Sequence, residues 1–168
     1  MFLNYHFSDH AYDSDIIFKE VSTDENAVVA DGVHIAVDPK KGCLSTERAK
    51  TGRLRATEIA LDARWLEVAI FMDQKEWLEC RCVHVKFRAS AKAATTINPA
   101  IRLLFDDGFH DLFLPEKCWI GTTPTDAAAT YHIPPNLTND AQRLELHLFL
   151  EPEDNCYELY DLVMTGVI

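Results

Sequence analysis

Aromatic, acidic and basic side chains alternate with apolar residues in several segments of this chain, and their types suit recognition of a hydroxylated ligand. Sugar recognition requires a flat aromatic surface for the apolar face of a pyranose ring and polar side chains for pairs of hydroxyl groups. Because alternate side chains of a strand point to the same side, we expect one concave sheet face to carry the candidates. They are Trp65, Glu67, Phe71, His84, Lys86, Arg88, Arg102, Glu145, His147 and Phe149.

This candidate face has other interpretations. Two of its arginines, Arg88 and Arg102, also have the geometry to bind a carboxylate or phosphate group. The face could instead be a solvated sheet exterior, or be covered by the N-terminal segment or by a second copy of the chain. An assembly module that forms a homodimer through this face is therefore an alternative to a binding module. Trp77 and Trp119 are each expected either to stack against a ligand or to plug one end of the fold.

Catalytic motifs are incomplete in this sequence. It has no Gly-x-Ser-x-Gly, no Gly-rich phosphate loop and no His-Glu-x-x-His. Glu67 and Glu145 would suit glycoside hydrolysis if their carboxyl groups lay about 5 to 9 Å apart. Cys80-Arg81-Cys82-Val83-His84 contains three potential zinc ligands, but alternate residues on a strand are roughly 6.5 Å apart, too far for joint tetrahedral ligation. We therefore expect noncatalytic binding, with a glycan hydrolase as a further alternative.

The segments that position these residues have the pattern of strands separated by turn-forming Asp, Asn, Gly and Pro residues. About ten strands with no helix between them exclude a parallel α/β sheet and leave a two-sheet sandwich or a barrel. Ser45–Lys50 and Asp73–Leu78 are predicted as single helical turns, Ser90–Thr96 as a loop, and Asp106-Asp107-Gly108 as a tight hairpin turn. The predicted strands are Asp15–Val21, Ala27–Val37, Arg53–Leu61, Trp65–Met72, Glu79–Ala89, Ala100–Asp106, Phe109–Leu114, Ala128–Ile133, Arg143–Leu150 and Tyr157–Gly166.

Alternation in three of these segments separates a core face from an outer face. In Arg143–Leu150 the leucines share one side, and the charged and aromatic residues share the other. Val83–Ala89 places its basic residues opposite its apolar ones, and Trp65–Met72 places its larger aliphatic residues opposite the two aromatic ones and the glutamate. Strands with one face for the core and one for solvent are what a sandwich requires.

A series of hydrophobic motifs runs in a fixed order along most of the chain. They are Ala30-Asp31-Gly32-Val33-His34-Ile35-Ala36-Val37, Cys82-Val83-His84-Val85-Lys86-Phe87-Arg88-Ala89-Ser90-Ala91, Thr95–Phe105, Trp119, Ala128-Ala129-Thr130-Tyr131-His132-Ile133-Pro134-Pro135, Arg143–Leu150 and Tyr157-Glu158-Leu159-Tyr160-Asp161-Leu162-Val163. In type and order they resemble the motifs of the jelly-roll carbohydrate-binding modules, part of the wider galactose-binding-domain-like group. The resemblance implies an all-β, two-sheet antiparallel jelly-roll sandwich that binds a carbohydrate or small polar ligand without catalysis.

The same resemblance raises the question of calcium. In that family an acidic residue of the last strand often helps to ligate a structural calcium ion, together with an N-terminal acidic residue. Asp161 stands at the matching position, so the resemblance makes it a candidate calcium ligand. Glu20 and Asp38 are both candidates for the second ligand, and the family's usual Gly-x-Phe-Glu opening is absent.

Length and charge restrict the partners. The 168 residues suit one domain, residues 1–168. A formal net charge of −11 repels phosphate backbones and anionic lipid, so we expect neither a nucleic-acid nor a membrane partner.

The five cysteines follow no disulfide framework spacing, and the first residues do not have the pattern of a signal peptide. Both observations predict a cytoplasmic protein with reduced thiols.

Overall fold

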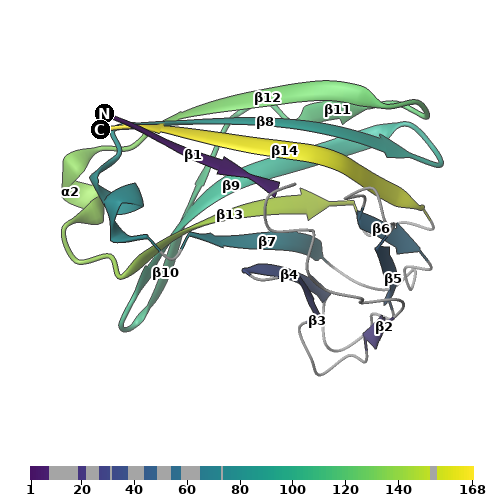
Figure 1. Cartoon of the computed structure of the whole chain (residues 1–168), viewed down its shortest axis with the longest axis horizontal. Helices are drawn as coiled ribbons and strands as arrows, with labels where there is room; N and C mark the ends of the chain where they lie inside the picture. Colours follow the sequence, from purple (N-terminus) through teal and green to yellow (C-terminus); the bar gives the residue numbers. More distant parts are fainter. Residues whose placement is uncertain are drawn as a thin grey trace.

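A computed structural model of the chain describes residues 1–7, 19–21, 27–30, 32–37, 44–48, 54–57, 65–72, 74–151 and 155–168. For residues 19–21, 27–30, 37, 44–48 and 54–57 it describes the backbone alone. The described strands form two antiparallel sheets that pack face to face as a sandwich (Figure 1). The prediction of an all-β, two-sheet sandwich is confirmed.

The first sheet, which we call sheet I, is built around the long C-terminal strand. Its order is β12-β8-β14-β6-β5-β2, and β1 also pairs with β14. The first residues of β14 pair with β6 and its last residues pair with β1, so the two chain termini lie side by side (Figure 1). The strands are β1 (Phe2–His6), β2 (Lys19–Val21), β5 (Leu44–Arg48), β6 (Leu54–Thr57), β8 (Cys82–Ala91), β12 (Thr125–His132) and β14 (Tyr157–Val167).

The second sheet, sheet II, has the order β10-β9-β13-β7-β4-β3, and β11 also pairs with β9. Its strands are β3 (Ala27–Ala30), β4 (Val33–Val37), β7 (Leu66–Met72), β9 (Thr95–Phe105), β10 (Gly108–Phe113), β11 (Cys118–Ile120) and β13 (Arg143–Leu150). Two short helical elements, η1 (Lys75–Glu79) and α2 (Pro135–Thr138), connect strands near the termini (Figure 1). No helix of the described part is long and apolar enough to cross a membrane.

The core lies between the sheets and contains the residues that alternation predicts. The leucines of β13 are buried, as are the alternate aliphatic residues of β7 and the apolar residues of Val83–Ala89. Trp77 closes one end of the core with 3% of its surface exposed. It packs so closely on β14 that a Cβ atom on Gly166 would lie 2.9 Å from its Cζ3 atom. Glycine is therefore required where the tryptophan meets the strand.

Pro99 lies in the middle of β9, where a proline is normally excluded because it has no N–H to donate. At this residue the outer neighbour of β9 changes, since β10 pairs on one side of it and β11 on the other. The carbonyl oxygen of Pro99 accepts a hydrogen bond of 2.7 Å from the Tyr131 hydroxyl of sheet I. The break in the ladder thus tolerates the proline and supplies a link between the two sheets.

Some element predictions were wrong. The predicted single strand Ala27–Val37 is the hairpin of β3 and β4, because Gly32 adopts a φ of +68° that turns the chain. Most of Ser45–Lys50, predicted as a helical turn, belongs to β5, which forms through pairing with β2 and β6. Strands β1 and β11 were not predicted. Residues 15–18 and 58–61 of two predicted strands lie outside the described residues.

Candidate functional site

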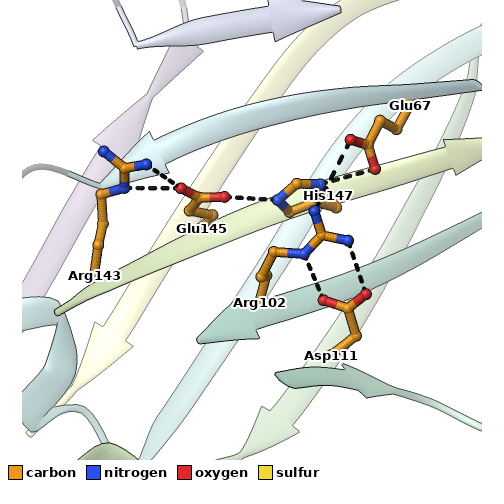
Figure 2. Close-up of polar contacts among 6 residues, drawn as sticks. All are labelled: Glu67, Arg102, Asp111, Arg143, Glu145 and His147. Atoms are coloured by element: carbon orange, nitrogen blue, oxygen red, sulfur yellow. Dashed lines mark hydrogen bonds and ion pairs between the residues drawn. The ribbon is translucent and has the colours of Figure 1, made fainter. Parts of the chain in front are cut away.

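Charged side chains from four neighbouring strands meet on the outer face of sheet II, the face opposite the core (Figure 2). The strand register brings them into rows. Asp111 of β10 lies opposite Arg102 of β9, which lies opposite Glu145 of β13. We call the following six residues the charged network: Glu67, Arg102, Asp111, Arg143, Glu145 and His147.

His147 lies at the centre of the charged network, with 2% of its surface exposed. Its Nδ1 atom is 3.0 Å from Oε2 of Glu67, and its Nε2 atom is 2.9 Å from Oε2 of Glu145. An ionised carboxylate only accepts hydrogen bonds, so a ring bonded to one on each side must carry a proton on both nitrogens. Burial alone would lower the pKa of His147, but its hydrogen bonds to Glu145 and Glu67 outweigh burial and raise it above the ordinary value. The raised pKa and the two carboxylate partners favour the imidazolium form of this side chain.

The strands make room for this ring. His147 lies opposite Ala100 of β9 on one side and Ala69 of β7 on the other. Because both neighbours have only a methyl group, the imidazolium can lie low against the sheet between its two carboxylates. The alternation of small and large residues in this row therefore buries the charge that the network contains.

Glu145 uses both of its carboxylate oxygens in hydrogen bonds within the network. Besides His147, it accepts a 2.8 Å hydrogen bond from Nε of Arg143 through Oε1. Burial would raise the pKa of Glu145, but the hydrogen bonds from His147 and Arg143 outweigh it and hold the pKa below its usual value. Glu145 is thus a stable carboxylate at neutral pH.

Arg102 closes the network on the side of β10. Its Nε and Nη2 atoms donate to the two carboxylate oxygens of Asp111 at 2.7 and 2.8 Å, and its Nη1 atom lies 4.0 Å from Oε1 of Glu67. Burial would lower the pKa of Arg102, but the hydrogen bond and charge of Asp111 raise it. Three carboxylates, two guanidinium groups and one imidazolium balance to zero charge, as a satisfied buried network requires.

Aromatic rings cover both sides of the charged network. The Phe149 ring lies 5.9 Å from the His147 ring and 5.5 Å from the Phe113 ring. The Arg102 guanidinium lies 4.0 Å from the centre of the Phe109 ring, within cation–π range. On the side of β7, the Phe71 ring contacts Arg143 at 4.4 Å and stacks on His34 at 4.2 Å.

Three large aromatic side chains are exposed at the border of this face. Phe109, Phe113 and Trp119 are 59%, 48% and 61% exposed. Their partners on β9 are Leu104, Ala100 and Thr96, even-numbered residues that share the outer face with Arg102. The three rings therefore lie on the same outer face as the charged network. We call them the aromatic edge.

An unpaired polar atom lies beside the aromatic edge. The Oδ1 atom of Asn98 is buried and has no hydrogen-bond partner. Asn98 is on the outer face of β9, opposite Phe149 and between the partners of Phe113 and Trp119. Buried acceptors are nearly always satisfied, so this unpaired atom is unusual.

The candidate set predicted from the sequence divides between the two sheets. Its members Glu67, Phe71, Arg102, Glu145, His147 and Phe149 come together on sheet II, and Trp65 lies half-buried directly before β7. The placement of His84, Lys86 and Arg88 on the same face was wrong: they are exposed on β8 of sheet I. Alternation distinguishes outer from core positions, but it does not tell which sheet a strand joins.

The sequence left two alternatives open, a glycan hydrolase and a metal site. Glu67 and Glu145 do meet, but they do so around His147, and the lowered pKa of Glu145 is the opposite of what a general acid requires.

The described residues contain no group of three His, Cys, Asp or Glu side chains that could hold a metal ion. Asp161 is exposed, and its Oδ1 atom accepts the Leu162 N–H at 2.9 Å. Asp38 and the Glu20 side chain lie outside the described residues, so calcium at Asp161 stays a prediction.

The fold can be compared with known proteins. No protein-family model matches the sequence, and no curated protein matches it. Among solved structures, a CBM4 carbohydrate-binding module is similar at 14% identity and a TM-score of 0.59, covering 95% of this chain and 98% of that one. The CBM22-1 xylan-binding domain of Paenibacillus barcinonensis Xyn10C is similar at 12% identity and a TM-score of 0.55, covering 98% and 93%.

A third similar structure is the C-terminal family 22 carbohydrate-binding module of Clostridium thermocellum Xyn10B. It is 14% identical, with a TM-score of 0.53 over 97% of this chain and 91% of that one. At such identities the likeness is one of fold. The chain has the jelly-roll fold of carbohydrate-binding modules, as its motifs predict.

Proposed function

We propose that this chain is a noncatalytic module that binds carbohydrate, or another hydroxylated polar ligand, on the outer face of sheet II. The observation that carries the proposal is the aromatic edge, whose three exposed rings lie on the same face as the charged network. The faces of exposed aromatic side chains suit the apolar faces of sugar rings. The fold shared with carbohydrate-binding modules supports the same proposal.

The spacing of the aromatic edge favours an extended ligand. Phe109 and Phe113 are four residues apart on β10, and the partners of Phe113 and Trp119 are four residues apart on β9. At about 3.3 Å per residue, each step is about 13 Å and the whole edge spans about 26 Å. A single sugar ring would contact one aromatic side chain, whereas an oligosaccharide or polysaccharide would contact several.

In this proposal the charged network positions the contacting groups. Its carboxylates already accept hydrogen bonds from His147, Arg143 and Arg102, so their main effect is to hold the face rigid. A rigid face loses little conformational entropy when a ligand binds. The Arg102 guanidinium also supports one face of the Phe109 ring.

Titration calorimetry with soluble polysaccharides tests the proposal. Xylan is the first probe because one similar structure is a xylan-binding domain. Trp119→Ala and Phe113→Ala should each weaken binding by about tenfold, since loss of a stacking contact costs roughly 1.4 kcal/mol. Phe2→Ala is the matched control, because Phe2 is 69% exposed on β1 of sheet I. If a polysaccharide binds and both sheet II variants keep the wild-type affinity, the proposed surface is wrong.

The alternative is that the aromatic edge joins two copies of the chain. Exposed rings beside a rigid face also suit a homodimer interface. Sedimentation equilibrium separates the two functions, because a dimer through this face would dissociate in the Trp119→Ala variant. A wild-type monomer that binds a glycan supports the binding function, and a wild-type dimer that binds none supports assembly.

A further inference from the structure

A polar pocket lies on sheet I, where β8 ends and β14 begins. Figure 1 shows these strand ends at the end of the sandwich opposite the chain termini. The volume of the pocket is about 410 Å³, and the pocket is lined by residues from the end of β8, the turn between β11 and β12, and the beginning of β14. This volume corresponds to about 14 water molecules at ~30 Å³ each, and it falls in the size range of small-molecule sites. The polar residues of its lining include Ser90, Lys92, Thr122, Glu158 and Tyr160.

The walls of this pocket are held by backbone and side-chain hydrogen bonds. The Asn155 side chain, 3% exposed, accepts from the N–H groups of Ala93 and Cys156 at 3.0 Å each and donates to the Ala93 carbonyl at 3.1 Å. The Lys92 N–H donates to the Cys156 carbonyl at 2.9 Å, and the Ala91 N–H donates to the carbonyl of the β11–β12 turn at 3.0 Å. These bonds fix the turns that surround the pocket, so its shape exists before a ligand binds.

A chain of hydroxyl groups forms the floor of the pocket. Ser90 and Glu158 are opposite each other on β8 and β14. The Tyr160 hydroxyl donates to Oε2 of Glu158, and the Ser90 hydroxyl lies 3.1 Å from the Tyr160 hydroxyl. Because a tyrosine hydroxyl has one proton, Ser90 must donate to Tyr160. Its own oxygen is then left as an acceptor, and the serine is 6% exposed.

The rest of the lining supplies donors. Lys92 contributes an ammonium group with three N–H donors, and Thr122 contributes an exposed hydroxyl that both donates and accepts. The ammonium of Lys92 balances the carboxylate of Glu158, so the described part of the lining carries no net charge. An anion would be repelled by this carboxylate and by the chain's net charge of −11, and a cation would be repelled by the ammonium group. A neutral ligand whose groups both donate and accept hydrogen bonds fits the pocket best.

We propose that this pocket is a second binding site, separate from the outer face of sheet II, that takes a neutral monosaccharide or disaccharide. Sugar hydroxyls on adjacent carbons satisfy an acceptor such as Ser90 and a donor such as Lys92 at the same time. The Tyr160 ring supplies an apolar surface within the same pocket. The site goes beyond the proposed binding on sheet II, because it lies on the other sheet and shares no residue with the aromatic edge.

Two-dimensional NMR of the isotope-labelled full chain tests this site. Glucose, galactose, mannose, xylose and their β-1,4-linked disaccharides are the probes, each titrated to millimolar concentration. At least one should shift the amide signals of residues 90–92, 121–123 and 155–160. Thr122→Trp, which fills the mouth of the pocket, should abolish these shifts, and Thr123→Trp is the control because Thr123 is exposed on the same turn and does not line the pocket.

A second pair of variants tests the chemistry without changing the pocket volume greatly. Lys92→Met should weaken binding roughly tenfold, whereas Lys86→Met, at an exposed position of β8, should leave it unchanged. Trp119→Ala should also leave these shifts unchanged, so failure of the sheet II proposal and failure of this one are distinguishable. The proposal is overturned if no probe shifts these amides, or if the shifts persist in Thr122→Trp.

Discussion

His147→Leu removes the centre of the charged network and should reduce the free energy of unfolding by about 3 kcal/mol at pH 7. The histidine donates two hydrogen bonds to carboxylates, of 3.0 and 2.9 Å, and such charge-assisted bonds contribute roughly 1.5–3 kcal/mol each. Removing one partner of a buried ion pair costs about 3–5 kcal/mol. We expect the lower end of this range, because Arg143 still binds Glu145.

Urea denaturation measures this loss through the midpoint and slope of a two-state transition. His84→Leu is the matched control, since His84 is exposed on sheet I and should change stability by no more than about 0.5 kcal/mol. The loss in His147→Leu should become smaller as the pH rises above 6.5, because the raised pKa of His147 means that the stabilisation from its protonated ring is lost at higher pH. It should also shrink when Glu145→Gln is added, since one unpaired charge is then removed.

Two results would refute the reasoning. One is a His147→Leu variant as stable as the His84→Leu control, which would show that the imidazolium does not compensate the two carboxylates. The other is a loss that stays the same in the presence and absence of Glu145→Gln. Independent effects of neighbouring residues would mean that the network is not energetically coupled.

Three further results follow from the described contacts. The charged network should stabilise the fold most between about pH 4.5 and 6.5. Because the pKa of His147 is raised, its contribution is complete below pH 6.5 and is lost at higher pH. Because the pKa of Glu145 is lowered, its contribution is complete above pH 4.5 and is lost at lower pH. Urea midpoints measured from below pH 4.5 to above pH 6.5 check the profile, and midpoints that do not fall outside this range contradict it. Gly166→Ala should cost about 1–3 kcal/mol in urea unfolding, because the new Cβ would lie 2.5 Å from the Cys80 sulfur. The cost should fall in a Cys80→Ala background, and full additivity would be inconsistent with this contact. Tyr131→Phe should lose about 1–3 kcal/mol by the same assay, since its buried hydroxyl donates a 2.7 Å bond across the core, and an unchanged midpoint would argue against that bond.

The sequence predicts the faces of the strands well because alternation is a local property of the backbone. In β13 it separates buried leucines from the outer residues Arg143, Glu145 and His147 without knowledge of any neighbour. It fails for His84 and Arg88, which have the same alternation but belong to sheet I. Membership of a sheet depends on long-range pairing, which no local pattern encodes.

Only some contacts of the charged network could be predicted from the sequence. The Asp106-Asp107-Gly108 turn fixes the register of the β9–β10 hairpin, and counting from it would have placed Asp111 opposite Arg102. The same count places Phe109 and Phe113 on the outer face. The contact between Glu67 and His147 had no such signal, because it joins strands that are 80 residues apart along the chain.

The indole N–H signals of the three tryptophans give the most direct test of ligand binding on sheet II. Trp77 is buried in the core, whereas Trp119 is exposed on the aromatic edge. Titration with a polysaccharide that binds should shift the Trp119 indole signal and the amides of β9 and β10, and leave the Trp77 indole unchanged. If the polysaccharide binds while the Trp119 indole and these amides do not move, the outer face of sheet II is not the binding surface.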